Sequence, residues 1–219
     1  MAKEREIKLR IADLPALRRA LANLGAQVVR RRLHERNVVF DTPELTLAKR
    51  EQLLRIRTEK GLGRAAEAAA RSLVTFKRPI LVTGSSEKGE RHKVREEIEL
   101  EVSDGKALAR IFEALGMRGW FHYEKFRTTF RLPGSRRWAK GLLLELDETP
   151  IGVFLELEGP AGAIDRAAQA LGFEKRDYIL ANYMTLYREY CQSRGEEPRD
   201  MLFAKSKRTA RSPKTIFFP

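Results

Sequence analysis

The sequence is poor in cysteine and has no long apolar runs. It has one cysteine, Cys191, in 219 residues, so no disulfide can form within the chain. Aromatic residues make up 8% of the chain. No apolar run approaches the roughly 18 residues that a transmembrane helix needs, and residues 1–10 lack the apolar core of a signal peptide. We therefore expect a cytoplasmic protein with no membrane partner.

Motifs for several common chemistries are also missing. The three histidines lie far apart in the sequence and lack metal-ligand spacing with Cys191, which argues against a zinc site. Residues 84–89 have the glycine spacing of a phosphate-binding P-loop, but Glu90 and Arg91 stand where that motif needs lysine and serine or threonine. This segment is predicted to be a hairpin turn.

Charge, by contrast, is abundant. Charged residues make up 33% of the chain, with 43 Lys and Arg against 30 Asp and Glu, so the net charge is +13 and the pI is about 10.1. A protein this basic is expected to bind an anionic partner. The hydrophobic fraction of 42% is enough for a folded core.

The basic charge is partly concentrated at the C-terminus, where residues 199–219 carry a net charge of +5. We predict one domain over residues 1–195 and a basic tail over 196–219. Such a tail typically adds only weak, salt-sensitive contact with nucleic acid or polyphosphate. The alternative is that one of two apolar segments, 201–203 or 216–218, plugs one end of a tunnel within the folded domain.

Apolar and charged residues alternate with period two in much of the chain, a pattern typical of β-strands. Eight strands are predicted, at 3–11, 35–41, 52–58, 73–78, 93–102, 123–131, 142–147 and 153–158. Helical spacing predicts four helices, at 13–24, 104–115, 162–171 and 177–192, and 60–71 is expected to be an expanded loop or short helix.

The charged faces of these strands carry short runs of acidic or basic groups rather than mixed polar residues. Eight strands can close into a barrel that holds one small ligand. A barrel lined with carboxylates and guanidinium groups cannot be dry, because an unpaired buried ion costs several kcal/mol. Its interior is therefore expected to contain water, metal ions and a polyanion.

An ordered set of short motifs resembles one known family. The first is Glu4-Arg-Glu6-Ile-Lys8. The others follow in the order Phe40–Pro43, Leu54–Arg57, Thr75–Lys77, Arg95–Glu99, Lys125–Arg127, Leu146–Asp147, Phe154–Glu158 and Asp177–Tyr178. Together they resemble the CYTH superfamily, the triphosphate tunnel metalloenzymes, over roughly residues 3 to 187. The resemblance implies an α+β fold, an eight-stranded antiparallel β-barrel flanked by helices, in agreement with the strand count.

The resemblance also suggests a role for each charged residue. Arginine binds phosphoryl oxygens through two parallel hydrogen bonds and lysine acts as a point charge. The predicted phosphate-binding residues are Lys8, Arg55, Arg57, Lys77, Arg95 and Arg127. Carboxylates suit hard divalent ions, so the predicted ligands of Mg²⁺ or Mn²⁺, with two ions expected, are Glu4, Glu6, Glu97, Asp147, Glu156 and Glu158.

Glu4, Glu6, Lys8 and Arg57 are the predicted catalytic residues. The alternative for any single residue is a structural salt bridge, such as Arg127 with Asp147, that only keeps the tunnel open.

The family includes class IV adenylyl cyclases, thiamine triphosphatases and inorganic triphosphatases. The reaction predicted first is metal-dependent hydrolysis of a small triphosphate, such as tripolyphosphate, thiamine triphosphate or a nucleoside triphosphate. The second is the cyclase reaction, which makes cyclic AMP and pyrophosphate from ATP. The third, from a different class, is non-catalytic binding of RNA or polyphosphate.

Overall fold

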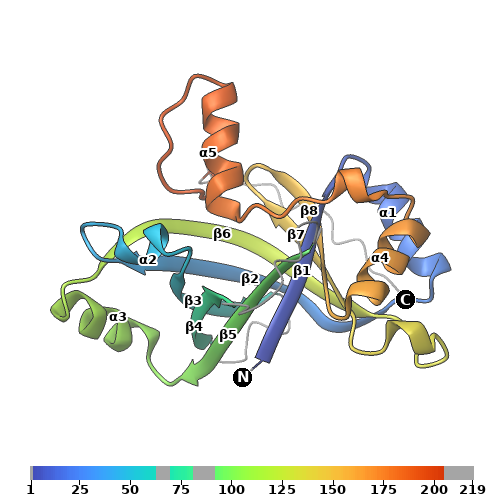
Figure 1. Cartoon of the computed structure of the whole chain (residues 1–219), viewed down its shortest axis with the longest axis horizontal. Helices are drawn as coiled ribbons and strands as arrows, with labels where there is room; N and C mark the ends of the chain where they lie inside the picture. Colours follow the sequence, from blue (N-terminus) through green and yellow to red (C-terminus); the bar gives the residue numbers. More distant parts are fainter. Residues whose placement is uncertain (1, 63–69, 81–91, 205–219) are drawn as a thin grey trace, which may run out of the picture.

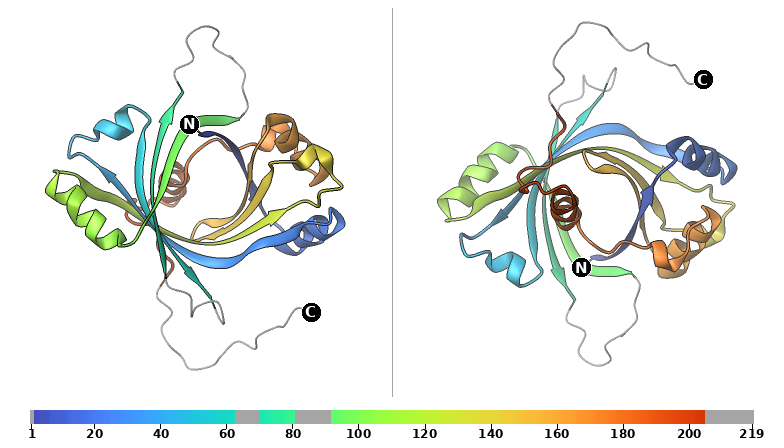
Figure 2. Two further views of the ribbon diagram at one scale, coloured as in Figure 1. Left: turned by 90° about the horizontal axis from the view of Figure 1, so that it is seen from below. Right: turned by 90° about the horizontal axis from the view of Figure 1, so that it is seen from above.

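The computed structural model describes residues 2–62, 70–80 and 92–204 of the chain. Its strands form a closed antiparallel barrel in the order β1-β5-β4-β3-β2-β6-β7-β8 (Figures 1 and 2). The strands are β1 (Ala2–Ile11), β2 (Gln27–Asp41), β3 (Leu53–Gly61), β4 (Arg71–Pro79), β5 (Lys93–Val102), β6 (Arg118–Arg131), β7 (Leu143–Thr149) and β8 (Gly152–Glu158). The predicted fold class, an eight-stranded barrel flanked by helices, is confirmed.

Helices lie outside the barrel wall and over one of its ends, as Figure 2 shows. They are α1 (Leu14–Asn23), α2 (Thr46–Lys49), α3 (Gly105–Ala114), α4 (Ala161–Ala170) and α5 (Tyr183–Ser193), with short 3₁₀ turns η2 (Arg137–Ala139) and η3 (Lys175–Asp177). Asp13 and Asp104 accept hydrogen bonds from backbone N–H groups at the starts of α1 and α3. Within the described residues, no helix is long and apolar enough to cross a membrane.

The hydrophobic core lies outside the barrel rather than within it. Outward-facing side chains of β1, β7 and β8 pack beneath α1 and α4, and Ile7, Leu9, Leu144, Leu155 and Ile164 of this layer are fully buried. Burying each such side chain stabilises the fold by about 1.5–3 kcal/mol. Because this layer supplies apolar burial, the inward faces of the same strands can carry charge.

Several element boundaries differ from the prediction. Strand β2 begins at Gln27 rather than at residue 35, because register shifts near Arg30 interrupt its alternation. The last predicted helix starts at Tyr183 rather than at 177, because Ile179 forms an isolated bridge with Lys8 of β1. The predicted turn at 84–89 and residues 63–69 of the predicted loop lie outside the described residues.

The first part of the predicted tail packs on the barrel. β7 pairs with β6 only from Phe126 onward, and Met201 lies beside the preceding part of β6, where its N–H donates to His122 O (2.9 Å) and its O accepts from Glu124 N (3.0 Å). The Met201 side chain is fully buried, and the ring of Phe203 packs on that of Phe126. Residues 205–219 lie outside the described residues, so a domain boundary at 195 stays a prediction.

Candidate functional site

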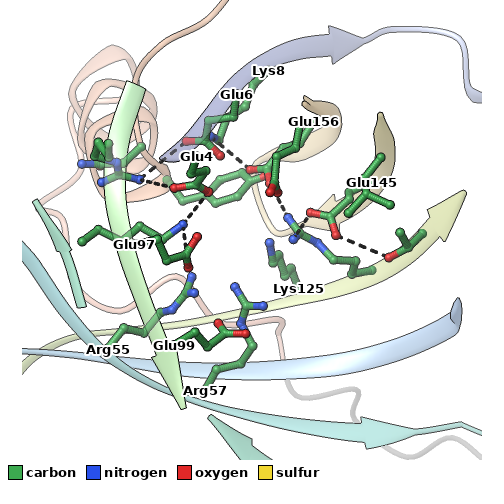
Figure 3. A pocket seen from close by; sticks show the side chains of 18 of the residues that line it. Glu4, Glu6, Lys8, Arg55, Arg57, Glu97, Glu99, Lys125, Glu145 and Glu156 are labelled. Carbon is green, nitrogen blue, oxygen red and sulfur yellow. Dashed lines mark hydrogen bonds and ion pairs between the residues drawn. The ribbon is translucent and has the colours of Figure 1, made fainter. Parts of the chain in front are cut away.

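Inward-facing side chains of all eight strands surround the interior of the barrel. They line a cavity of about 910 Å³, and sixteen of its 24 lining residues are charged (Figure 3). Small-molecule pockets are usually lined mainly by apolar groups, so this composition is unusual. It indicates a ligand that is itself highly charged.

One side of the cavity, which we call the carboxylate wall, consists of the inward glutamates of β1, β7 and β8. Its members are Glu4, Glu6, Glu145, Glu156 and Glu158. The strand register brings them together, because Glu6 lies opposite Glu158 and Glu145 opposite Glu156. The Lys8 ammonium lies among them, with its Nζ 3.2 Å from an oxygen of Glu6 and 3.2 Å from an oxygen of Glu156.

The carboxylates of this wall differ strongly in pKa. Burial and the Glu156 carboxylate oppose ionisation of Glu6, but the ammonium groups of Lys8, Lys77 and Lys93 together outweigh them and lower the pKa of Glu6 to about 2. Burial, together with the carboxylates of Glu145 and Glu4, raises the pKa of Glu158 to about 8. Burial also raises the pKa of Glu4. The wall therefore contains both charge-balanced carboxylates and carboxylates whose charge is not offset.

A second group of side chains, which we call the cation wall, consists of Arg55 and Arg57 on β3, across the barrel from β8, and Lys125 and Arg127 on β6, next to β7. In Figure 3, Arg55 and Arg57 extend toward the carboxylate wall from the facing side of the barrel. Arg55 donates to Tyr123 Oη and to Thr75 Oγ1, each at 3.1 Å.

Asp147 of β7 accepts hydrogen bonds from two cations of this wall, Lys125 and Arg127. Its carboxylate is fully buried and accepts hydrogen bonds from Lys125 Nζ (2.8 Å), Arg127 Nε and Nη2 (both 2.6 Å) and Tyr183 Oη (2.6 Å). Arg127 also pairs with Glu145 and Glu156. Asp147 does not line the cavity, and all of these contacts are with protein groups, so its predicted role as a metal ligand stays a prediction.

Strands β4 and β5 complete the site with mixed charge. Lys77 Nζ lies 2.6 Å from Glu4 Oε1 and 3.2 Å from Glu97 Oε1. Arg95 Nη2 lies 3.6 Å from Glu6 Oε1. Apart from Asp147, every residue predicted to bind phosphate or metal lines this one cavity.

The structure also brings in residues that the sequence did not predict for the site. They are Glu35 and Asn37 of β2, Tyr123 and Lys125 of β6, Glu145 of β7 and Tyr183 at the start of α5. Glu35, Asn37 and Glu145 alternate with outward residues in their strands, so period two alone would have placed them inside. Tyr183 gives no such signal, because its position depends on α5 lying over the end of the barrel.

The carboxylate wall fits a hard divalent cation. In the described part of the chain, no group of three or more acidic, histidine or cysteine side chains is already arranged around one point. However, Glu4 Oε2 is buried with no hydrogen-bond partner. No hydrogen bond or ion pair joins Glu158 to another described residue. Buried oxygens of like charge with free lone pairs are suitable ligands for Mg²⁺ or Mn²⁺.

Comparison with known proteins places this barrel in a family. Residues 2–179 match the CYTH domain. The chain belongs to the CYTH family. The CYTH enzymes are triphosphate tunnel proteins that generally depend on a divalent metal, and membership implies a triphosphate substrate.

Individual CYTH relatives resemble the chain over most of its length. A protein of Methanocaldococcus jannaschii named "putative adenylate cyclase" is 25% identical over 84% of this chain and 97% of its own. A conserved protein of Pyrococcus furiosus is 25% identical, with a TM-score of 0.63 over 84% of this chain and 99% of its own. A Hippeastrum protein described as having a dominant triphosphatase activity has a TM-score of 0.51 and 21% identity, over 89% and 97% of the two chains.

Proposed function

We propose that this CYTH protein is a divalent-metal-dependent hydrolase of a small triphosphate. The observation that carries the proposal is that a carboxylate wall and a cation wall line one cavity, in which sixteen of 24 lining residues are charged. A phosphate chain needs cations along its length, and the divalent ions that accompany it need carboxylates nearby. The two walls supply both.

In this proposal the cation wall holds the substrate. Arg55 and Arg57 donate to phosphoryl oxygens from β3, and Lys125 and Arg127 do so from β6. The contacts of Arg55 with Tyr123 and Thr75, and of Lys125 and Arg127 with Asp147, fix these donors before the substrate arrives. Positioning of this kind, with charge stabilisation, accounts for most of the catalysis of phosphoryl transfer.

The carboxylate wall would hold the metal. Glu4, Glu6 and Glu158 are the proposed ligands, with Glu156 and Glu97 beside them. A bound divalent ion neutralises charge on the phosphates and activates a water molecule for attack on the terminal phosphorus. Lys8, paired with Glu6 and Glu156, keeps both carboxylates ionised and presents a further cation to the phosphate chain.

Adenylyl cyclase activity is the second candidate, because relatives of the chain bear that name. The cyclase reaction requires a site for adenine, and the apolar residues that line the cavity are Val29, Leu53, Ile98 and Leu143. Four apolar residues among sixteen charged ones favour a ligand made mainly of phosphate, so we rank hydrolysis first.

The test is to incubate the protein with tripolyphosphate, thiamine triphosphate or ATP, in Mg²⁺, Mn²⁺ or EDTA, and to identify the products. Metal-dependent phosphate release supports the hydrolase. Cyclic AMP with pyrophosphate identifies a cyclase, and binding without any product identifies a non-catalytic polyphosphate- or RNA-binding module. Glu6→Gln controls for contaminating phosphatases, because it should lose the activity. Glu124→Gln, on the outer face of β6, should keep it.

A further inference from the structure

A buried carboxylate, that of Glu35, lies close to three side chains of the cation wall but does not line the cavity. Strand β2 runs between β3 and β6, and Glu35 points inward from it with no exposed surface. Its oxygens lie 3.5 Å from Arg57 Nε, 3.5 Å from Lys125 Nζ and 3.9 Å from Arg127 Nε. Glu35 is not part of the cavity lining, so a bound phosphate would meet these three cations and not Glu35 itself.

Asp147 and Glu35, the two buried carboxylates beside the cation wall, differ in their hydrogen bonds. Asp147 accepts hydrogen bonds from Lys125, Arg127 and Tyr183 and so sets the directions of their donors. Neither oxygen of Glu35 has a hydrogen-bond partner among the described residues. The Nε of Arg57 donates instead to Asn37 Oδ1, at 3.2 Å. Asp147 and Asn37 therefore orient the cations, whereas Glu35 contributes its charge alone.

Burying a carboxylate without hydrogen bonds is costly, and the attraction of the three nearby cations offsets that cost. Burial opposes the ionisation of Glu35, but Arg57 and Lys125, followed by Arg127, outweigh it and hold the pKa of this carboxyl well below its usual range. Glu35 is thus ionised throughout the physiological range. Its negative charge therefore repels every anion that Arg57, Lys125 and Arg127 bind.

We propose that Glu35 is a positioning residue that acts through Arg57, Lys125 and Arg127 to weaken the hold of the tunnel on phosphate chains, so that the product can leave. The inference rests on the proposed binding of a triphosphate in this cavity. Without Glu35, the cations would keep the orientations that Asp147 and Asn37 give them, but their attraction for an anion would no longer be partly cancelled. The Glu35 carboxylate lies 3.5 Å from Arg57 and Lys125 and 3.9 Å from Arg127. A buried unit charge acts strongly over such distances, because the effective dielectric constant inside a protein is about 20.

The test is isothermal calorimetry of tripolyphosphate and of pyrophosphate in EDTA, so that binding is measured without turnover. Glu35→Gln removes the charge and keeps the shape, and we expect both anions to bind about tenfold more tightly than to the wild type, equivalent to about 1.4 kcal/mol. Glu35→Asp keeps the charge and should bind within about threefold of the wild type. Glu124→Gln, which removes a carboxylate paired with Arg36 on the outer face of β6, should bind like the wild type.

Unchanged or weaker binding by Glu35→Gln, with normal binding by the wild type, would overturn the inference and leave the proposed function standing. A wild type that binds neither anion would overturn both. If Glu35→Gln is poorly stable, thermal melts with and without saturating tripolyphosphate decide the question. A larger ligand-induced rise in Tm than in the wild type supports the inference, and an equal or smaller rise contradicts it.

Discussion

The carboxylate wall and the cation wall arise from the same alternation of residues, yet they are supported differently. Side chains of the cation wall donate hydrogen bonds to neutral or acidic partners, such as Tyr123, Asn37 and Asp147. In the carboxylate wall, Glu158 has no such partner among the described residues, and burial, together with the neighbouring carboxylates, raises its pKa to about 8. The cation wall is thus organised before an anion binds, whereas Glu158 in the carboxylate wall gains a partner only when a cation binds.

The largest expected effect comes from removing charge in the carboxylate wall. Glu6→Gln and Glu158→Gln should each lower turnover by at least about a hundredfold, because losing even a residue that supports a metal ligand costs about 10–100-fold. Their stabilities should differ. Glu6→Gln removes the negative charge that pairs with Lys8 and Arg95, so it should lower Tm. Glu158→Gln breaks no ion pair among the described residues, so it should leave Tm unchanged or raise it. Steady-state kinetics at limiting Mg²⁺ and thermal melts measure both effects.

The control for these variants is Glu148→Gln, which removes a carboxylate from the outer face of β7, where it pairs with Arg32. It should retain wild-type turnover. Full activity of both tunnel variants at limiting Mg²⁺ would contradict the metal assignment.

A smaller effect is expected from a subtle change in the cation wall. Arg57→Lys keeps the charge but loses the forked geometry and the hydrogen bond to Asn37. We expect kcat/KM to fall roughly ten- to a hundredfold, equivalent to about 1.5–3 kcal/mol of charge-assisted hydrogen bonding, while Tm changes little. Arg36→Lys on the outward face of β2 is the matched control. A severe fall in Tm with normal kinetics per folded molecule would show that Arg57 is structural.

The pKa of Glu158 predicts how the metal-free protein responds to pH. The folded value of about 8 lies above the ordinary value of 4.5, so the folded state binds more protons than the unfolded state between these pH values. Stability should therefore fall as pH rises from about 4.5 through 8. We expect Mg²⁺ to oppose this fall, and Glu158→Gln to remove much of it. Melts from pH 5 to 9, in EDTA and in Mg²⁺, test both statements; a profile equally steep in Glu158→Gln would assign the effect to other groups.

The smallest effect is expected from shortening the end of the chain. A chain ending at Ala204 loses five basic residues but keeps Met201 and Phe203, so kinetics with a small triphosphate should stay within about twofold of the full chain. Its salt-sensitive binding to long polyphosphate or RNA should weaken. A chain ending at Glu197 also loses the buried Met201, and should be less stable by about 2–5 kcal/mol. Equal Tm values for the two shortened chains would contradict this.

The sequence predicted the barrel well because its alternation is strong and local. Each predicted strand is present, and the segments where prediction failed have specific causes. The N-terminal part of β2 was missed because bulges near Arg30 displace the inward positions. Helix α2 has only four residues, and Asp41 stabilises it by accepting hydrogen bonds from the N–H groups of Leu47 and Ala48. A helix this short has no periodicity to detect.

The site was predictable only as a set of residues that face inward. The motifs identified which residues share the cavity, but the pairing of Asp147 with Lys125 and Arg127 depends on β6 lying beside β7. The place of Glu35 between two cationic strands depends on β2 lying between β3 and β6. Strand order is a long-range property, and the alternation within one strand contains no information about its neighbours.

The position of β1 in the barrel has a consequence for synthesis. β1 pairs with β5 and with β8, so Glu4 and Glu6 cannot meet Glu158 until the ribosome has made most of the chain. Until then Ile7 and Leu9, fully buried in the finished protein, have no partner strand in β8. Contacts this distant in sequence make folding slow, on the order of milliseconds to seconds. The nascent chain therefore exposes the apolar side chains of β1 for longest, which makes β1 the expected point of chaperone contact.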